Sequence, residues 1–205
     1  MWSGLRVGLL GGSFNPAHDG HRHISLEALR RLNLDAVWWL LSPQNPLKPA
    51  QGMAPLEDRM AGARLVADHP SIVVSSLERD LATRFTAATL AKLRARFHRT
   101  RFVWLMGADN LNQIPAWQHW TRIFNSVPIA VFDRPTYSLK ALSGKAARRY
   151  ARNRRPATCA HGLAKSAPPA WVFLTIRQHT ASATEIRANG AAPTIAPARK
   201  DEVRP

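Results

Sequence analysis

The stretch GGSFNPAHDGHRHIS, residues 11–25, decides the fold through what stands on either side of it. Before it, residues 6–10 read RVGLL, a short apolar run of strand length. After it, apolar residues recur from Leu26 to Leu32 at the spacing of one helix face. The sequence therefore predicts a strand, a tight glycine turn and a helix.

The turn in this unit has the features of an anion site. Gly11 and Gly12 carry no Cβ, so the backbone can approach a ligand closely. His18 and His21 lie three residues apart where the helix should begin, so their imidazoles share one side of the first turn. Free backbone N–H groups and the positive end of the helix dipole point the same way, and they favour a phosphate as the ligand.

The composition fits one folded α/β domain with anionic partners. The chain has 205 residues, 45% of them hydrophobic, and its net charge is +16, which favours nucleotides or nucleic acid. No apolar run reaches the roughly 18 residues that span a bilayer, and the amino terminus lacks the apolar region of a signal peptide. The single Cys159 excludes an internal disulfide and a CxxC metal site. We expect a cytoplasmic protein without a membrane contact.

The rest of the chain alternates strands and helices, which is typical of a parallel sheet. Apolar runs predict strands at residues 36–41, 72–74, 102–106, 127–132 and 171–176. Spacing and capping residues predict helices at residues 55–68, 84–97, 111–124, 139–150 and 182–190, and prolines predict a loop at residues 42–49. The expected fold is a Rossmann-like, doubly wound parallel sheet with helices on both faces. It forms one domain over residues 1–190, followed by a flexible tail over residues 191–205.

A basic insert occupies about residues 136–169. No acidic residue stands between Asp133 and Glu185, whereas ten Lys and Arg residues fall in that interval. The insert begins with the helix expected at residues 139–150 and continues as a connector rich in Pro, Ala and Ser. Its charges form a solvated face, widen an electrostatic funnel for anionic substrates, or contact RNA without sequence preference, and the sequence leaves these alternatives open. It also leaves the oligomeric state open.

The string G-G-x-F-x-P-x-H-x-G-H at the start of the chain resembles the first signature of the HxGH nucleotidyltransferase superfamily. Within that superfamily it most resembles the bacterial nicotinate-nucleotide adenylyltransferases. Phosphopantetheine adenylyltransferases resemble it less, because they usually have threonine in place of His18. The resemblance covers about residues 5–190.

Further motifs resemble the part of that family that binds the nicotinate nucleotide. Residues 84–90 resemble the motif S-Y-T-x-D-T-L, which lies against the pyridine ring, although Ala88 replaces the aspartate. The pattern W-x-x-W-x-x-I begins at Trp117, and the resemblance implies that this indole stacks on the nicotinate ring, beside the backbone N–H of Gln118. Lys48 matches a lysine of the family's proline-rich loop, where Leu47 replaces a histidine.

Other positions point to ATP. Gly107 and Asp109 follow the strand at residues 102–106, where a glycine permits close approach and a carboxylate can bind ribose hydroxyls or cap a helix. Residues 181–187 resemble the second family signature, I-S-S-T-x-I-R, which is implied to hold the β- and γ-phosphates, although Ala183 departs from it. Ser182 and Glu185 have the spacing of a capping box, which independently predicts a helix start there.

Taken together, the resemblance implies the following site. The catalytic residues are His18, His21 and Arg187. The ATP-binding residues are Gly11, Gly12, Ser13, Phe14, Gly107, Asp109, Ser182, Thr184 and Arg187. The nicotinate-nucleotide-binding residues are Ser13, Asn15, Lys48, Phe85, Thr86, Trp117, Gln118 and Arg134.

The reaction implied is the transfer of AMP from ATP to nicotinate mononucleotide, which gives deamido-NAD and pyrophosphate in NAD biosynthesis. Since the sequence offers no carboxylate cluster, we expect no protein metal site and an Mg²⁺ ion held mainly by the substrate phosphates. Two alternatives stand beside this function. One is a sister adenylyltransferase that acts on nicotinamide mononucleotide or phosphopantetheine. The other is a basic nucleotide- or RNA-binding protein that kept the fold and lost catalysis.

Overall fold

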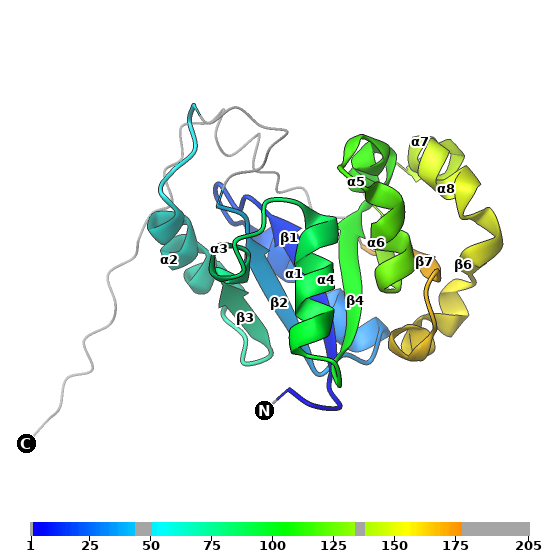
Figure 1. The fold of residues 1–205 in the computed structure, drawn as a ribbon, viewed down its shortest axis with the longest axis horizontal. Coiled ribbons are helices and arrows are strands. Elements are labelled where there is room, and N and C mark those ends of the chain that lie inside the picture. The colour runs from blue at the N-terminus through cyan, green and yellow to red at the C-terminus, as the bar shows by residue number, and fades with distance from the viewer. Residues whose placement is uncertain (1, 44–50, 134–137, 178–205) are drawn as a thin grey trace, which may run out of the picture.

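One parallel sheet forms the centre of the molecule. The computed structural model describes residues 2–43, 51–133 and 138–177, and Figure 1 shows their arrangement. Seven strands lie in these residues, in the spatial order β3-β2-β1-β4-β5-β7-β6, and each neighbouring pair is parallel. Their bounds are β1 Arg6–Gly12, β2 Ala36–Leu41, β3 Ile72–Ser75, β4 Arg101–Gly107, β5 Ile129–Phe132, β6 Arg154–Arg155 and β7 Trp171–Leu174.

The direction in which the sheet is wound reverses next to β1. From β1 the chain steps outward to β2 and β3, and it then returns to β4 on the other side of β1. In such a sheet the carboxyl ends of the strands at the reversal enclose the crevice where ligands bind. The predicted Rossmann-like fold is therefore confirmed, and its crevice falls at Gly12 and Gly107, the last residues of β1 and β4.

Helices cover both faces of the sheet, with α4 and α6 in front and α1 behind in Figure 1. The front face carries α4 (Thr86–Arg96), α5 (Ala108–Gln113), α6 (Trp120–Ser126), α7 (Ser138–Ser143) and α8 (Lys145–Arg149); the other carries α1 (Asp19–Arg31), α2 (Leu56–Ala67) and the 3-10 helix η3 (Ala157–Lys165). The short helices are α3 (Leu77–Asp80), η1 (Ile114–Ala116) and η2 (Ala151–Asn153). Among the residues described, no helix has the length and apolar character needed to cross a membrane.

Successive side chains of each strand point to opposite faces of the sheet, and this explains the two layers of the core. In the central strands Leu9 and Trp104 pack into the core on the front face, whereas Leu10 and Leu105 pack into the core on the other. All six residues of β2 are buried, as a strand inside a parallel sheet requires. Every strand predicted from the sequence is present, and its ends differ from the prediction by two residues at most.

The glycine turn predicted at Gly11 and Gly12 is wrong. Both residues belong to β1 and pair with Leu40 and Leu41 of β2. The chain turns at Phe14 instead, which has a left-handed backbone with φ 46°. Gly11 has a different reason to be glycine, because a Cβ there would overlap the indole ring of Trp104.

The helix predicted over residues 111–124 is also wrong, because the structure divides it into α5, η1 and α6. Pro115 lies in η1, and Trp117 leaves it with an extended backbone. His119 has φ 54° and ψ 35°, a left-handed conformation that no helix interior accepts. Trp117 therefore stands on a turn, and only Trp120 of the two tryptophans lies in a helix.

The basic insert holds more structure than predicted. Its expected helix divides at Gly144, where a Cβ would stand 3.1 Å from the carbonyl oxygen of Ala141. The connector that follows contains η2, the edge strand β6 and η3. The short helix α3 was not predicted either.

Candidate active site

The start of α1 lies at the carboxyl edge of the sheet, directly after the turn that follows β1. His18 is the residue that caps α1, with an extended backbone, and only 7% of it is exposed. Its Nδ1 accepts a hydrogen bond from the backbone N–H of Gly20 at 3.2 Å. In return, the Nδ1 of His21 accepts a hydrogen bond from the backbone N–H of His18, also at 3.2 Å. The two histidines thus form a reciprocal capping box.

This capping box assigns the hydrogen on each neutral imidazole. A ring nitrogen that accepts a hydrogen bond carries no hydrogen, so the hydrogen of both rings lies on Nε2. The first turn of α1 therefore carries two Nε2–H groups, whereas its backbone N–H groups at Gly20 and His21 already donate to His18. Since the Nε2–H groups donate and the helix dipole is positive here, the arrangement suits an anion with several oxygen atoms.

Ring packing holds the two imidazoles in place. Their ring centroids are 3.9 Å apart, and the ring of His21 lies 4.6 Å from that of Phe14. Phe14 is buried and stacks on Trp39 of β2 at 5.0 Å. Ser25 accepts from the Trp39 indole and donates to the backbone carbonyl of His21. The cost of the left-handed backbone at Phe14 is therefore offset by the packing of its ring, which also supports His21.

Two side chains fasten the loops around this turn. The amide of Asn15 donates to the carbonyl of Gly52 at 2.9 Å and accepts from the N–H of Ala54 at 3.2 Å. Arg59, on α2, is only 4% exposed, and it donates to four backbone carbonyls, the nearest being that of Ser13 at 2.6 Å. The sequence interpretation missed Arg59. The available signal was a basic residue at helical spacing from Leu56, on the apolar face of α2.

The predicted ATP residues of the crevice occupy the ends of two adjacent strands. Gly12 ends β1, and Gly107 ends β4 and caps α5 through its backbone. Asp109 lies in the first turn of α5, so the alternative that it caps this helix is wrong. A carboxylate in the first turn still faces the positive end of the helix.

Four of the predicted nicotinate-nucleotide residues belong to elements of the front face: Phe85, Thr86, Trp117 and Gln118. Phe85 precedes the first residue of α4, Thr86, and is 37% exposed although it is a large apolar side chain. Trp117 is half-buried against the core on that face, and its neighbour Gln118 is exposed. Phe85 and Trp117 thus belong to the layer opposite to that of α1, which carries the histidines.

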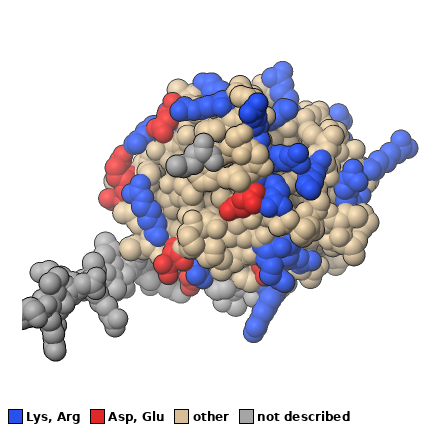
Figure 2. Space-filling model, turned by 90° about the horizontal axis from the view of Figure 1, so that it is seen from below, with Lys and Arg blue, Asp and Glu red and all other residues tan. Residues whose placement is uncertain are grey.

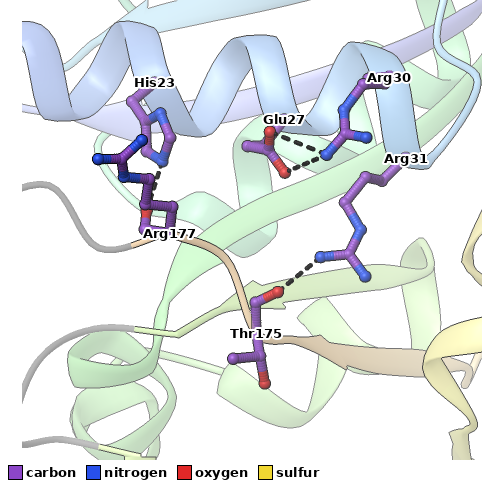
Figure 3. Close-up of polar contacts among 6 residues, drawn as sticks. All are labelled: His23, Glu27, Arg30, Arg31, Thr175 and Arg177. Carbon is purple, nitrogen blue, oxygen red and sulfur yellow. Dashed lines mark hydrogen bonds and ion pairs between the residues drawn. The ribbon is translucent and has the colours of Figure 1, made fainter.

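The second signature falls outside the described residues, but the segment that leads to it is described. After β7 the chain runs along α1, as Figure 3 shows. Arg31 at the end of α1 donates to the carbonyl of Thr175 at 2.6 Å, and the ring of His23, two turns nearer the start, contacts the carbonyl of Arg177 at 2.7 Å. The segment therefore advances from the end of α1 toward the end that carries His18.

Some predictions cannot be placed in the structure. Lys48, Arg134, Ser182, Thr184, Glu185, Arg187 and the tail over residues 191–205 lie outside the described residues. Within the described ranges, no group of three or more His, Cys, Asp or Glu side chains is arranged to hold a metal ion.

Comparison with known proteins adds to this geometry. The family model described as cytidylyltransferase-like matches residues 9–189. A protein of Cereibacter sphaeroides named "Probable nicotinate-nucleotide adenylyltransferase" is 53% identical over 184 residues, which are 90% of this chain and 97% of that protein. A protein of the same name from a Bradyrhizobium species is 54% identical over 183 residues, which are 89% of this chain and 95% of the relative.

Solved structures share the fold at low sequence identity. The nicotinic acid mononucleotide adenylyltransferase of Plasmodium falciparum, complexed with NaAD, superposes with a TM-score of 0.67 and 14% identity, over 90% of this chain and 83% of that one. The same enzyme complexed with APC gives a TM-score of 0.65 and 13% identity, with the same coverage.

Proposed function

Because the chain belongs to the nicotinate-nucleotide adenylyltransferases, within the cytidylyltransferase-like family, we propose that it transfers AMP from ATP to nicotinate mononucleotide and releases pyrophosphate. The observation that carries this function is the pair of imidazoles that caps α1. Both Nδ1 atoms accept from the backbone, so the ring hydrogen of each lies on Nε2, the atom that we propose donates to the ligand. Donors of this kind suit phosphate oxygens.

The chemistry is a displacement at phosphorus. A phosphate oxygen of nicotinate mononucleotide forms a bond to the α-phosphorus of ATP, and the bond from that phosphorus to the β-phosphate breaks. Pyrophosphate leaves with the bonding electron pair. Because the second pKa of a phosphate monoester is about 6, the attacking oxygen is already ionised near neutral pH and needs no general base. The site has to align two anions and neutralise the charge that develops between them.

His18 and His21 meet this need from the start of α1. We assign their Nε2–H groups to the α- and β-phosphate oxygens, where negative charge develops as pyrophosphate leaves. Ser182, Thr184 and Arg187 are proposed to hold the β- and γ-phosphates. The path of the segment after β7 supports this assignment, because it runs along α1 toward the histidines.

The two nucleotides take different parts of the crevice in this proposal. The adenosine of ATP lies at Gly107 and Asp109, where the glycine lets a nucleotide approach the end of β4. The nicotinate ring lies at Phe85, Thr86 and Trp117, where an exposed phenylalanine and a half-buried indole offer aromatic surface. A pyridinium ring is electron-poor, so it stacks favourably on an indole face.

Magnesium is proposed as an ion that the substrate phosphates hold. The described residues provide no cluster of His, Cys, Asp or Glu side chains for it, whereas phosphate oxygens are ligands that Mg²⁺ prefers. When bound, the ion neutralises part of the triphosphate charge. The remaining charge falls to the imidazoles and the proposed Arg187 guanidinium.

A cytoplasmic location completes the proposal. Cys159 is the single cysteine of the chain, and it is exposed and unpaired. An exposed free thiol persists in a reducing compartment.

The acceptor decides between this function and its alternatives. Pyrophosphate release is measured with ATP and, separately, nicotinate mononucleotide, nicotinamide mononucleotide or phosphopantetheine. We expect the highest kcat/KM with the nicotinate form. A preference for another acceptor would replace the substrate assigned here, and no turnover with any of them would favour the binding protein without catalysis.

A further inference from the structure

We propose that Arg59 and Glu78 are positioning residues that act together on Ser42 and thereby hold the nicotinate-nucleotide side of the crevice in its working shape. This inference rests on the proposed function and goes beyond it. Neither residue belongs to the site that the sequence predicts. Both are buried and ionisable, and they reach Ser42 from two different helices.

Arg59 gathers three segments of backbone at one guanidinium. Its Nη1 donates to the carbonyls of Ser13 and Ser42 at 2.6 and 2.8 Å. Its Nη2 donates to the carbonyl of Pro43 at 3.0 Å, and its Nε donates to that of Ala54 at 2.9 Å. The turn after β1, the end of β2 and the approach to α2 thus meet at a single side chain.

Only arginine can make this set of contacts. A guanidinium carries five N–H donors in one planar fork, whereas the ammonium of lysine has three donors at one point. In the described residues Arg59 forms no ion pair, and its N–H groups bond to carbonyl oxygens, while the carboxylate of Glu57 acts on its charge only through space. Burying a charge in this way is costly, and an apolar residue would fill α2 at lower cost. A role of Arg59 in ordering backbone segments that the site requires explains why this charge is buried.

Glu78 reaches Ser42 from the other side. It is 6% exposed, and its carboxyl accepts a hydrogen bond from the Ser42 hydroxyl. The hydroxyl of Thr89 on α4 lies 3.4 Å from the same carboxyl and 2.9 Å from the hydroxyl of Thr83. Thr89 sits one turn after Phe85, to whose carbonyl its N–H donates at 3.0 Å. The carboxyl therefore connects the end of β2 to the start of α4.

Ser42 is the point where these contacts join. Its carbonyl accepts from Arg59, its hydroxyl donates to Glu78, and its N–H donates to the carbonyl of Gly12 at 2.9 Å. One residue thus links β1, α2 and the α3–α4 region. The elements linked in this way carry Asn15, Phe85 and Thr86, which are assigned to the nicotinate nucleotide, and also Gly12 and Ser13, which are assigned to ATP. Gly107 and Asp109, on the proposed adenosine side, belong to elements that the contacts do not reach.

The test compares the two substrates in variants of the full chain. Arg59→Gln, Ser42→Ala and Glu78→Ala are expected to lower kcat/KM for nicotinate mononucleotide about 10- to 100-fold, since small displacements of a reacting group have effects of that size. The KM for ATP is expected to rise less, because the contacts do not reach Gly107 and Asp109. Arg59→Lys is expected to have a kcat/KM for nicotinate mononucleotide between that of the unchanged protein and that of Arg59→Gln, because lysine keeps the charge and loses the planar set of donors. The matched control is Arg64→Gln, an exposed arginine on the same helix.

A second measurement separates positioning from general instability. Amide hydrogen exchange, measured without substrates, is expected to speed up in residues 11–17 and 51–55 of Arg59→Gln and to remain unchanged in α5. Equal loss for both substrates, or unchanged kinetics in Ser42→Ala and Glu78→Ala, would overturn the proposal. If Arg59→Gln does not fold, Ser42→Ala and Arg59→Lys decide the question. If the unchanged protein does not use nicotinate mononucleotide, the proposed function fails. Faster local exchange in Arg59→Gln would then show that Arg59 has a structural role alone.

Discussion

His18 has an observed structural role and a proposed catalytic role, and the two lie on different atoms. Its Nδ1 caps α1, and its Nε2 is the atom assigned to the triphosphate. Asparagine is among the best helix caps, yet it has no atom at the position of Nε2. We therefore expect His18→Asn to keep the stability of the protein and to lose turnover by at least about 100-fold, the range found when a donor to a developing oxyanion is removed.

His18→Ala is the comparison for this prediction. It lacks both the cap and the catalytic donor, so it should lose turnover as well as about 1 kcal/mol of stability. Urea unfolding and pyrophosphate release, measured on the same preparations, separate the two losses. Full activity in His18→Asn would show that the ring serves only to cap the helix.

Glu78 makes the stability of the fold depend on pH. Burial raises the pKa of its carboxyl from 4.5 to about 7, although the hydroxyls of Ser42 and Thr89 oppose the shift. The folded state then holds this proton more tightly than the unfolded chain does. Its contribution is therefore fully present below pH 4.5 and is lost as the pH rises to about 7. A shift of this size corresponds to about 3 kcal/mol.

Glu78→Gln tests this dependence because glutamine keeps the shape of the side chain and does not titrate. The difference in unfolding free energy between the unchanged protein and the variant is measured in urea at pH 5 and pH 8. We expect the unchanged protein to lose stability relative to the variant between these two values. All other titratable groups are the same in the two proteins. A difference in unfolding free energy that stays constant between pH 5 and pH 8 would therefore mean that Glu78 titrates at its ordinary pKa.

At the scale of elements, α1 guides the chain after β7 toward the proposed phosphate site. Arg31→Ala removes the hydrogen bond to the carbonyl of Thr175. One such bond contributes about 1 kcal/mol, so we expect the KM for ATP to rise up to about fivefold while the KM for nicotinate mononucleotide changes little. Arg30→Ala is the matched control, since among the described residues Arg30 bonds only to Glu27 on the same helix (Figure 3). Equal effects of the two variants would contradict a guiding role for this contact.

The same scale shows what the sequence could predict. The strands were predictable because buried parallel strands are continuous apolar runs, as in β2. The break at His119 was not, because Trp117, Trp120 and Ile123 keep helical spacing across a turn that depends on one left-handed backbone. The edge strand β6 was not either, since its two arginines carry no apolar pattern and are held by pairing with β7.

In the site, too, features set by neighbours in the sequence could be predicted, whereas those set by distant segments could not. The position of His18 and His21 at the start of a helix was predictable, because it follows from neighbours in the sequence. Arg59 and Glu78 were not, because each acts on backbone or hydroxyl groups brought from other segments. A buried arginine that binds carbonyls leaves in the sequence only a basic residue on an apolar helix face.

At the scale of the whole molecule, charge is unevenly distributed. Eight exposed cations lie between α7 and η3, and none forms an ion pair within the described residues; they are Lys140, Lys145, Arg148, Arg149, Arg152, Arg154, Arg155 and Lys165. Figure 2 shows acidic side chains over the left and central parts of one face and only basic ones toward the right, the side of α8 and β6 in Figure 1. This basic insert packs against α5 and η1, which carry Asp109 and lead to Trp117.

Two anionic substrates should therefore be attracted to the crevice by the insert. Lys140→Gln, Lys145→Gln and Arg148→Gln, combined in one variant, are expected to lower kcat/KM at low salt and to flatten its decline with ionic strength, because the attraction is screened beyond about 10 Å at 0.1 M salt. The control combines Arg94→Gln, Arg99→Gln and Arg101→Gln, which remove the same charge near the amino-terminal end of β4. If both variants show the same salt dependence, net charge rather than its position would govern the attraction. If neither differs from the unchanged protein, the insert is a solvated face with no part in substrate capture.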